Sequence, residues 1–196
     1  MDSINIIKKV CENISNSNIE IAKEIIREEY PHNFIEPEKR DMSSYEKLKV
    51  FLRDGFIDRY SGEKLIFPNV LRIVSEELGD VFPYHRNWKM SDCHIAYWEY
   101  FPTYDHIVPI ARGGKDVEDN VVTTSQKNNS LKSNFLLEEI QWKLHKKGSL
   151  SDWDGMISWY MSYIASNESI LERIDKNGYW HKALMKCIEE RTYETD

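Results

Sequence analysis

The chain of 196 residues is long enough for one domain, or for one domain with an appendage. Hydrophobic residues make up 41% of it and aromatic residues 12%, with few glycines and prolines, which indicates a globular protein and excludes a disordered or fibrous one. The formal net charge of −7 argues against strong, sequence-independent binding to nucleic acid, which usually needs a basic surface.

The start of the chain carries no secretory signal, because Lys8, Lys9 and Glu12 interrupt its apolar residues. No apolar run approaches the ~20 residues that a membrane-spanning helix needs. We therefore expect a soluble, cytoplasmic protein without a membrane partner. The three cysteines are far apart and form no C-x-x-C pair, so we expect buried thiols and neither a disulfide framework nor a structural zinc site.

Residues 1–53 are predicted to form an N-terminal helical region. Apolar residues recur at helical spacing over residues 1–30, with a break and a cap at residues 16–18. The polar residues 32–41 are expected to form a linker or surface loop. Ser43 with Glu46 has the spacing of a capping box, which predicts a third helix that ends near Leu52.

Residues 54–150 are predicted to contain the core of the protein. A β-hairpin is expected over residues 55–67, where short apolar runs flank a Ser-Gly-Glu turn. Pro68 suits the first turn of a helix that continues to Leu78, with Gly79 as its stop. Apolar spacing also predicts a helix over residues 135–145.

Residues 151–196 are expected to form helices that pack on this core. One is predicted over residues 153–165, a second one is capped by Asn167 and ends at Ile174, and the last covers residues 179–190. The tryptophans of this region are spaced as in helix packing. A platform on which nucleic-acid bases stack is the alternative interpretation.

The most informative segment covers residues 104–134, in which polar groups surround a predicted hairpin. Asp105 and His106 stand together at the end of a strand, so their side chains should point to opposite faces. His106 suits a general base, because an imidazole can take up a proton from water, whereas the Asp105 carboxylate suits a hard cation. Gly113 and Gly114 suit a turn. The return strand follows, and Thr124-Ser125 can cap the next helix.

This segment resembles the HNH nuclease superfamily, which has the ββα-metal fold. The resemblance rests on residues 105–109, the Gly113-Gly114 pair, Asn120 and Asn129, with Lys132 just after. It implies an α+β protein in which an HNH core lies within a mostly helical domain. Each residue alone has an ordinary structural interpretation, as a turn, a helix start or a surface histidine.

The resemblance implies a role for each matched residue. Asp105 and Asn129 correspond to ligands of one divalent cation, Mg²⁺ or Mn²⁺, and His106 to the general base. Asn120 corresponds to the residue that holds the imidazole in place. Arg112 and Lys132 are candidate contacts to a DNA phosphate, with exposed, solvated side chains as the equal alternative.

Many HNH proteins carry zinc-binding cysteine pairs on either side of the hairpin. In this chain those positions fall near residues 58–61 and near Ser125 and Asn128, and none of them is a cysteine. If the fold is present, packing is expected to replace the zinc.

The implied function is metal-dependent hydrolysis of DNA phosphodiester bonds, of the kind used in restriction or phage defence. Residues 105–149 hold seven Lys and Arg against six Asp and Glu, so this region is nearly neutral. We therefore expect the enzyme to act as a homodimer or with a partner protein that delivers the substrate. The alternatives are a non-catalytic DNA-binding module on the same fold, and an all-helical interaction protein without a hairpin at residues 104–123.

Overall fold

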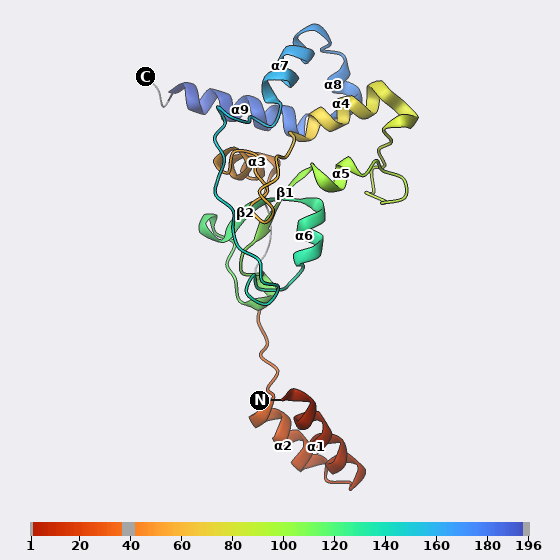
Figure 1. Cartoon of the computed structure of the whole chain (residues 1–196), viewed down its shortest axis with the longest axis vertical. Helices are drawn as coiled ribbons and strands as arrows, with labels where there is room; N and C mark the ends of the chain where they lie inside the picture. The colour runs from red at the N-terminus through yellow and green to blue at the C-terminus, as the bar shows by residue number, and fades with distance from the viewer. Residues whose placement is uncertain (1, 37–41, 194–196) are drawn as a thin grey trace. The chain divides into compact units, whose positions relative to one another are not determined.

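The computed structural model describes residues 2–36 and 42–193 and divides the chain into two compact units (Figure 1). The first unit is Met1–Glu36 and the second is Pro37–Asp196. The predicted linker lies at this division: residues 32–36 form neither helix nor strand, and residues 37–41 lie outside the described part. Among the described residues, no helix combines the length and the apolar character needed to cross a bilayer.

The first unit consists of the two predicted helices, which pack on each other. Helix α1 (Ser3–Ser15) begins where the Asp2 side chain accepts a hydrogen bond from the backbone N–H of Ile4. Helix α2 (Ile19–Glu29) begins after Asn18, whose side chain makes no capping bond. Among the cysteines, Cys11 on α1 is exposed, which corrects the prediction of three buried thiols; Cys93 and Cys187 are buried.

The second unit combines helices with one small sheet and is therefore an α+β structure. Its α-helices and strands, in chain order, are α3 (Ser44–Arg53), α4 (Pro68–Leu78), α5 (Ala96–Glu99), β1 (Pro102–His106), β2 (Val121–Ser125), α6 (Gln126–Lys132), α7 (Ile157–Ser166), α8 (Ile170–Ile174) and α9 (Tyr179–Tyr193). Short 3₁₀ turns occur at Gly79–Val81 (η1), Ile110–Arg112 (η2) and Glu118–Asn120 (η3).

Helix α3 belongs to this second unit, whereas the sequence grouped it with the first two helices. It packs against α9 and against both strands, and its Phe51 is fully buried. The main core joins α3 and α4 to the C-terminal helices, with Phe67 and Tyr160 at its centre and their rings 5.0 Å apart. The C-terminal helices therefore complete the core, as Figure 1 also shows for α9 beside α3.

Strands β1 and β2 form an antiparallel pair in which Pro102 lies opposite Ser125 and His106 lies opposite Val121. The prediction of a hairpin in this region is confirmed, and the all-helical alternative is wrong. All five residues of β2 are buried, because α3 and the segment that follows it cover this strand.

The outer edge of β2 is satisfied by side chains and loop backbone rather than by a third strand. The backbone N–H of Thr123 donates to Asp54 (2.8 Å), and that of Ser125 donates to Asp58 (2.9 Å). The carbonyl of Thr123 accepts from the backbone N–H of Arg59 (2.8 Å). Because these bonds occupy the outer edge of β2, this edge presents little free backbone for pairing with another strand.

Helix α6 directly follows β2 and packs on both strands. The Ser125 side chain accepts a hydrogen bond from the backbone N–H of Asn128, so the predicted cap is present. Strand, strand and helix thus follow one another in the chain and lie together in space (Figure 1).

The predictions for α3 and α4 are confirmed, whereas those for residues 55–67 and 135–145 are wrong. The capping box of Ser43 and Glu46 is present, and Gly79 ends α4 with a φ of 56°. The predicted hairpin at residues 55–67 is a chain reversal with one isolated bridge, between Ile57 and Lys64.

The predicted helix at residues 135–145 is not formed. Its backbone instead bonds to a distant segment: the N–H of His145 donates to the carbonyl of Arg59 (2.8 Å), and the Arg59 guanidinium donates to the carbonyl of His145 (2.6 Å). Trp142 packs on Tyr60 with ring centroids 5.5 Å apart. Tertiary bonds therefore outweigh the helical spacing of the apolar residues in this segment.

The C-terminal helices keep their predicted order with shifted starts. Helix α7 begins at Ile157 rather than near residue 153, and α8 begins at Ile170, after the predicted cap at Asn167. Helix α9 begins at Tyr179 as predicted.

Candidate active site

Strand β1 places Asp105 and His106 side by side in sequence and on opposite faces of the hairpin. The Asp105 side chain is 13% exposed and His106 is 5% exposed, so both polar groups lie largely within the protein. Buried polar groups require hydrogen-bond partners, and the partners of these two residues define the site.

Asp105 is held by a lysine and a tyrosine. Its Oδ2 forms an ion pair with Lys132 Nζ (2.9 Å) and accepts a hydrogen bond from the hydroxyl of Tyr60 (2.7 Å). Burial and then the nearby Asp105 carboxylate raise the pKa of Tyr60, so the phenol stays protonated and remains a donor. Within the described part of the chain, Oδ1 of Asp105 makes no hydrogen bond, which leaves one carboxylate oxygen for a further ligand.

His106 is held by Asp116, which the sequence did not single out. The Nε2 atom of His106 lies 2.8 Å from Oδ1 of Asp116. In the tautomer in which Nε2 donates to Asp116, Nδ1 is the ring atom with a free lone pair. The Tyr104 ring packs edge-on against the imidazole, with centroids 5.6 Å apart. Orientation of the ring therefore comes from Asp116 and Tyr104.

Asn120 clamps the loop between the strands rather than contacting the imidazole through its amide. Its Oδ1 accepts from the N–H of Val108, and its Nδ2 donates to the carbonyls of Val108 and Lys115, each at 2.9 Å. Its own carbonyl accepts from the N–H of Ile107 (2.8 Å), next to His106. Asn120 thus fixes the backbone that leaves His106, which is an indirect form of the predicted positioning.

The two glycines permit this clamp in different ways. Gly113 has a φ of 88°, a left-handed conformation that suits glycine. A Cβ on Gly114 would lie 1.8 Å from the carbonyl oxygen of Val108 and 2.9 Å from Nδ2 of Asn120. The second position therefore has no room for a side chain while the clamp is closed.

Asn129 lies on α6, half-buried, and its side chain makes no hydrogen bond to a described residue. Its amide oxygen and Oδ1 of Asp105 are hard oxygen donors, which fit Mg²⁺ or Mn²⁺ better than zinc. No cluster of three or more His, Cys, Asp or Glu suited to a metal occurs among residues 2–36 and 42–193. A cation here would have few protein ligands and would keep several waters, as Mg²⁺ commonly does.

The two candidate phosphate contacts lie in different environments. Lys132 is fully buried, so the exposed, solvated alternative is wrong for it; Nζ donates to Asp105 and to the carbonyl of His106 (2.7 Å). Arg112 is exposed and forms two hydrogen bonds to Glu139, at 2.8 and 3.2 Å. The hydrogen bond from Arg112 lowers the pKa of Glu139, so this carboxylate stays ionised beside the turn.

A buried carboxylate joins the positions at which the resemblance would place zinc ligands. The fully buried Asp58 accepts from the N–H of Tyr60, from the hydroxyl of Thr124, from the N–H of Ser125 and from the amide of Asn128, at 2.8 to 3.1 Å. Hydrogen bonds to one carboxylate thus connect these two positions.

Asp58 also positions both partners of Asp105. It fixes the backbone of Tyr60, whose hydroxyl reaches Asp105. It also holds the first turn of α6, at whose end lies Lys132. The geometry around Asp105 thus depends on a residue that does not itself touch Asp105.

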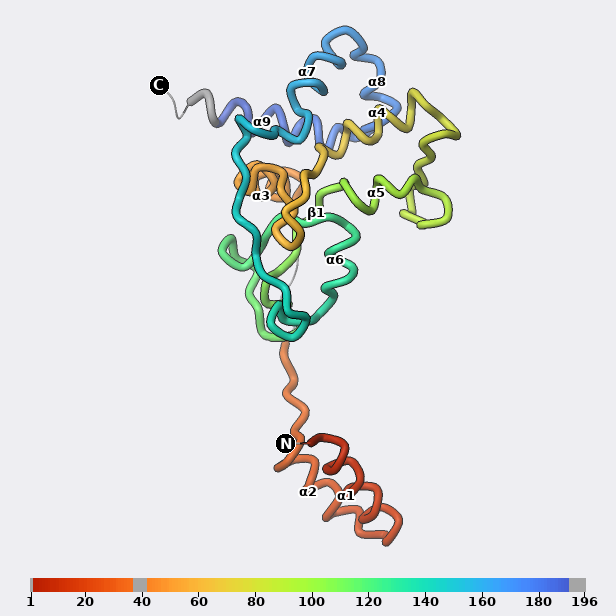
Figure 2. Tube along the Cα trace, in the orientation of Figure 1, coloured from red at the N-terminus to blue at the C-terminus, as the bar shows by residue number. Residues whose placement is uncertain are grey.

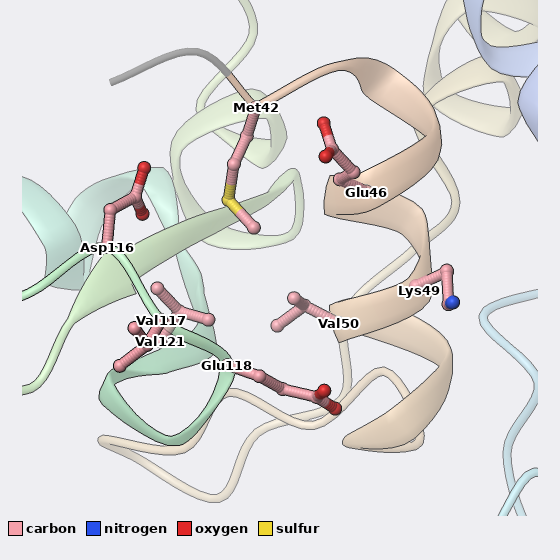
Figure 3. A pocket seen from close by; sticks show the side chains of 8 residues that line it. All are labelled: Met42, Glu46, Lys49, Val50, Asp116, Val117, Glu118 and Val121. Carbon is pink, nitrogen blue, oxygen red and sulfur yellow. The ribbon is translucent and has the colours of Figure 1, made fainter. Parts of the chain in front are cut away.

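A pocket of about 300 Å³ lies between α3 and the loop that returns to β2, and Asp116 is one of the residues that line it (Figure 3). Hydrogen bonding from Ser43 lowers the pKa of Glu46, so this lining carboxylate is ionised. Among the described residues that line it, three are carboxylates and one is an ammonium. It is lined by Met42, Glu46, Lys49, Val50, Asp116, Val117, Glu118 and Val121.

The site as a whole combines one strand–strand–helix unit with the loop that Asn120 closes. The unit carries Asp105 and His106 on β1 and Asn129 on α6, which packs against β1. Comparison of the chain with protein-family models, with curated proteins and with solved structures found no match.

Proposed function

We propose that this protein is a metal-dependent endonuclease of the HNH type that hydrolyses DNA phosphodiester bonds. The observation that carries the proposal is the placement of Asp105 and His106 on adjacent positions of β1, beside a helix that bears Asn129. Two further features support it. Asn120 closes the loop between the strands, and Gly114 has no room for a side chain there; both residues belong to the set on which the resemblance to the HNH superfamily rests.

Each residue has a distinct role in the proposed reaction. Nδ1 of His106 takes a proton from the attacking water, and base catalysis of this kind contributes roughly 10²–10⁴ in rate. Asp116 keeps the ring in the tautomer that leaves Nδ1 free. Asp105 and Asn129 would hold a divalent cation, which when bound offsets the charge that develops on the phosphate.

The Lys132–Asp105 ion pair supports a second candidate function, a DNA-binding module that does not cut. An ammonium 2.9 Å from the carboxylate occupies one of its oxygens, and His106 is nearly inaccessible to solvent. In the nuclease, Asp105 exchanges this partner or uses Oδ1 for the cation; in the binding module, the ion pair is permanent.

The test is cleavage of supercoiled plasmid by the purified full chain with Mg²⁺ or Mn²⁺, with EDTA as a control. We expect His106→Ala to lower the rate about 100-fold or more. The matched control is His145→Ala, which removes an exposed imidazole of the same unit and should leave the rate unchanged.

Equal cleavage by wild type and His106→Ala would contradict the proposal. Metal-independent binding of DNA without any cutting would favour the non-catalytic module. Nicked circles as the first product would indicate one strand cut per encounter; linear product from the outset would indicate paired subunits, because a single site cuts one strand at a time.

A further inference from the structure

Residues 142–147, here called the lysine segment, carry three lysines and no aspartate or glutamate. The lysines are Lys143, Lys146 and Lys147, and all three are exposed. Figure 2 shows the chain after α6 as an extended trace that passes α3 toward the C-terminal helices, and the lysine segment forms neither helix nor strand. Three positive charges within this short segment are a strong local concentration in a chain whose formal net charge is −7.

The backbone of the lysine segment is fixed at its middle and just beyond its end. The N–H of His145 donates to the carbonyl of Arg59, whose guanidinium donates to the carbonyl of His145. The N–H of Gly148 donates to the carbonyl of Asp54 (3.0 Å), and a Cβ on Gly55 would lie 2.5 Å from the carbonyl carbon of Gly148. The three lysines therefore extend from a backbone that is already ordered, which lowers the entropic cost of binding a ligand.

The Asp54 carboxylate lies beside the lysine segment, and two arginines already neutralise it. This fully buried carboxylate is 3.0 Å from Nε of Arg53 and 3.3 Å from Nη1 of Arg59. Nζ of Lys147 is 4.0 Å away, at the outer limit for an ion pair, and the Lys147 side chain is 51% exposed. A buried carboxylate needs a charged partner, and Asp54 has two without Lys147, so the Lys147 ammonium is positive charge in excess.

The acidic residues that precede the lysine segment are engaged elsewhere. The hydrogen bond and charge of Glu139, and then the charge of Glu138, raise the pKa of Arg112, so both carboxylates lie near that guanidinium. Within residues 2–36 and 42–193, Lys143 and Lys146 form no ion pair. The ammonium groups of the lysine segment are therefore available to an anionic ligand.

The lysine segment begins next to the candidate active site. The Trp142 ring packs on Tyr60 with centroids 5.5 Å apart, and the Tyr60 hydroxyl donates to Asp105 (2.7 Å). These two contacts place the start of the segment within about four phosphates of a bond held at Asp105, because the phosphates of one DNA strand are about 3.4 Å apart along the axis. The segment itself spans at most about 20 Å, or about six phosphates.

The chemistry of these side chains suits a phosphate backbone. An ammonium group binds phosphate as a point charge, and such contacts position DNA without reading its bases. The two other cations near the site are already paired within the protein, Lys132 with Asp105 and Arg112 with Glu139. The His145 ring is not part of this surface, because it lies beside Gly62, where an added Cβ would be 2.7 Å from its Nδ1.

We propose that Lys143, Lys146 and Lys147 bind the phosphate backbone of the DNA substrate and hold the strand that is cut at Asp105. The inference rests on the proposed function for the identity of the ligand. It assigns the phosphate contacts to the lysine segment instead of to Lys132 and Arg112. An acidic chain then binds a polyanion through a local concentration of positive charge, whatever its net charge.

The test measures binding of a labelled duplex oligonucleotide to the full chain by fluorescence anisotropy, in EDTA and over a range of salt concentrations. Each ammonium–phosphate contact adds about 0.9 to the steepness with which log K falls against log salt. We therefore expect the variant with Lys143→Gln, Lys146→Gln and Lys147→Gln to bind more weakly than the wild type, with a slope that is less steep by about 2–3.

The matched control carries Lys8→Gln, Lys23→Gln and Lys176→Gln, which remove the same charge at three exposed positions outside the lysine segment. This control should keep the slope of the wild type. Equal slopes in the two triple variants would overturn the proposal, and so would a wild-type chain whose binding is independent of salt or absent.

Acetylation of lysines by acetic anhydride, read by mass spectrometry, needs no substitution and therefore stands if a variant fails to fold. DNA at saturating concentration should slow the acetylation of Lys143, Lys146 and Lys147 severalfold and leave that of Lys8 and Lys176 unchanged. Equal acetylation of the lysine segment with and without DNA would overturn the proposal.

Cleavage of plasmid in Mg²⁺ separates this inference from the proposed function. Binding through the lysine segment without any cleavage would contradict the proposed nuclease alone. Cleavage by the wild type together with an unchanged slope in the variant of the lysine segment would contradict this inference alone.

Discussion

Asp58 and Asp105 are two carboxylates within one strand–strand–helix unit, and their partners differ in kind. Asp58 accepts four hydrogen bonds, two of them from backbone N–H groups that cannot move without unfolding the strand or loop. Asp105 is held by two side chains, through a hydrogen bond from Tyr60 and an ion pair with Lys132. Its other carboxylate oxygen, Oδ1, makes no hydrogen bond to a described residue. A carboxylate bound by backbone is a structural element, whereas one held by side chains can exchange its partners.

Asp58 is therefore a structural carboxylate, whereas Asp105, which also contributes to stability through its ion pair with Lys132, is the carboxylate that we propose binds a cation. The structural carboxylate also supports the functional one, because Asp58 fixes the segment of Tyr60 and the start of the helix that carries Lys132. Substitutions can separate the two roles.

Loss of the Lys132 ammonium should have the largest effect on stability. Lys132→Met leaves the Asp105 carboxylate largely buried without its charged partner, so we expect the free energy of unfolding in EDTA to fall by about 3–5 kcal/mol. Added Mg²⁺ should restore more stability to this variant than to the wild type, because Asp105 is then free to bind the cation.

Urea unfolding followed by circular dichroism measures this change. Lys115→Met, at an exposed position on the loop between β1 and β2, is the control and should differ from the wild type by less than about 0.5 kcal/mol. A Lys132→Met protein as stable as this control would show that the ion pair contributes nothing.

Asp58→Asn should be the next most damaging change. The amide keeps one acceptor oxygen and turns an NH₂ group toward donors, so we expect a loss of about 2–3 kcal/mol. The same urea experiment applies, with the exposed Asp152→Asn as a control of equal chemistry. Full stability in Asp58→Asn would refute a structural role for this carboxylate.

Asp116→Asn tests the orientation of His106. We expect the rate of plasmid cleavage to fall about 10–100-fold, because an amide holds the imidazole less firmly and permits either tautomer. Asp119→Asn, three residues away and exposed, should cut at the wild-type rate. Similar rates in the two variants would mean that Asp116 does not position the base.

Arg112→Gln should have the smallest effect, because the ion pair with Glu139 is exposed to solvent and screened by salt. The Arg112 guanidinium holds the pKa of Glu139 below its usual value. Any stabilisation from this pair is therefore present above the ordinary pKa of glutamate, about 4.3, and disappears as the pH falls through the lower folded-state pKa.

Thermal unfolding of the wild type and Arg112→Gln at neutral and at acid pH measures this dependence. The difference between their midpoints should be small at neutral pH and vanish in acid. A difference that grows on acidification would contradict the assigned sign.

Local signals in the sequence were sufficient for several elements. The capping box of Ser43 and Glu46 opens α3, and the proline and glycine at either end of α4 mark its limits. Ser125 caps α6 as predicted. In each case the decisive contact lies within a few residues of the signal, so the sequence alone contains it.

The sequence could not reveal contacts between distant segments. Asp58 meets Ser125 across 67 positions, and nothing near Asp58 distinguishes it from an exposed aspartate. Likewise, nothing near Asp116 in the sequence marks it as the partner of His106. The segment at residues 135–145 has helical spacing, but its hydrogen bonds to Arg59 depend on the folded core. Fold class and the hairpin were predictable, whereas the partners of each site residue were not.

Binding of Mn²⁺ measures the central claim most directly, because its electron paramagnetic resonance signal reports the free ion in a titration of the full chain. We predict one Mn²⁺-binding site in the wild type. This site should be lost in Asp105→Asn and kept in Asp119→Asn, which removes the same charge. Equal binding by both variants and the wild type would place the cation elsewhere and would contradict the assignment of Asp105 as its ligand.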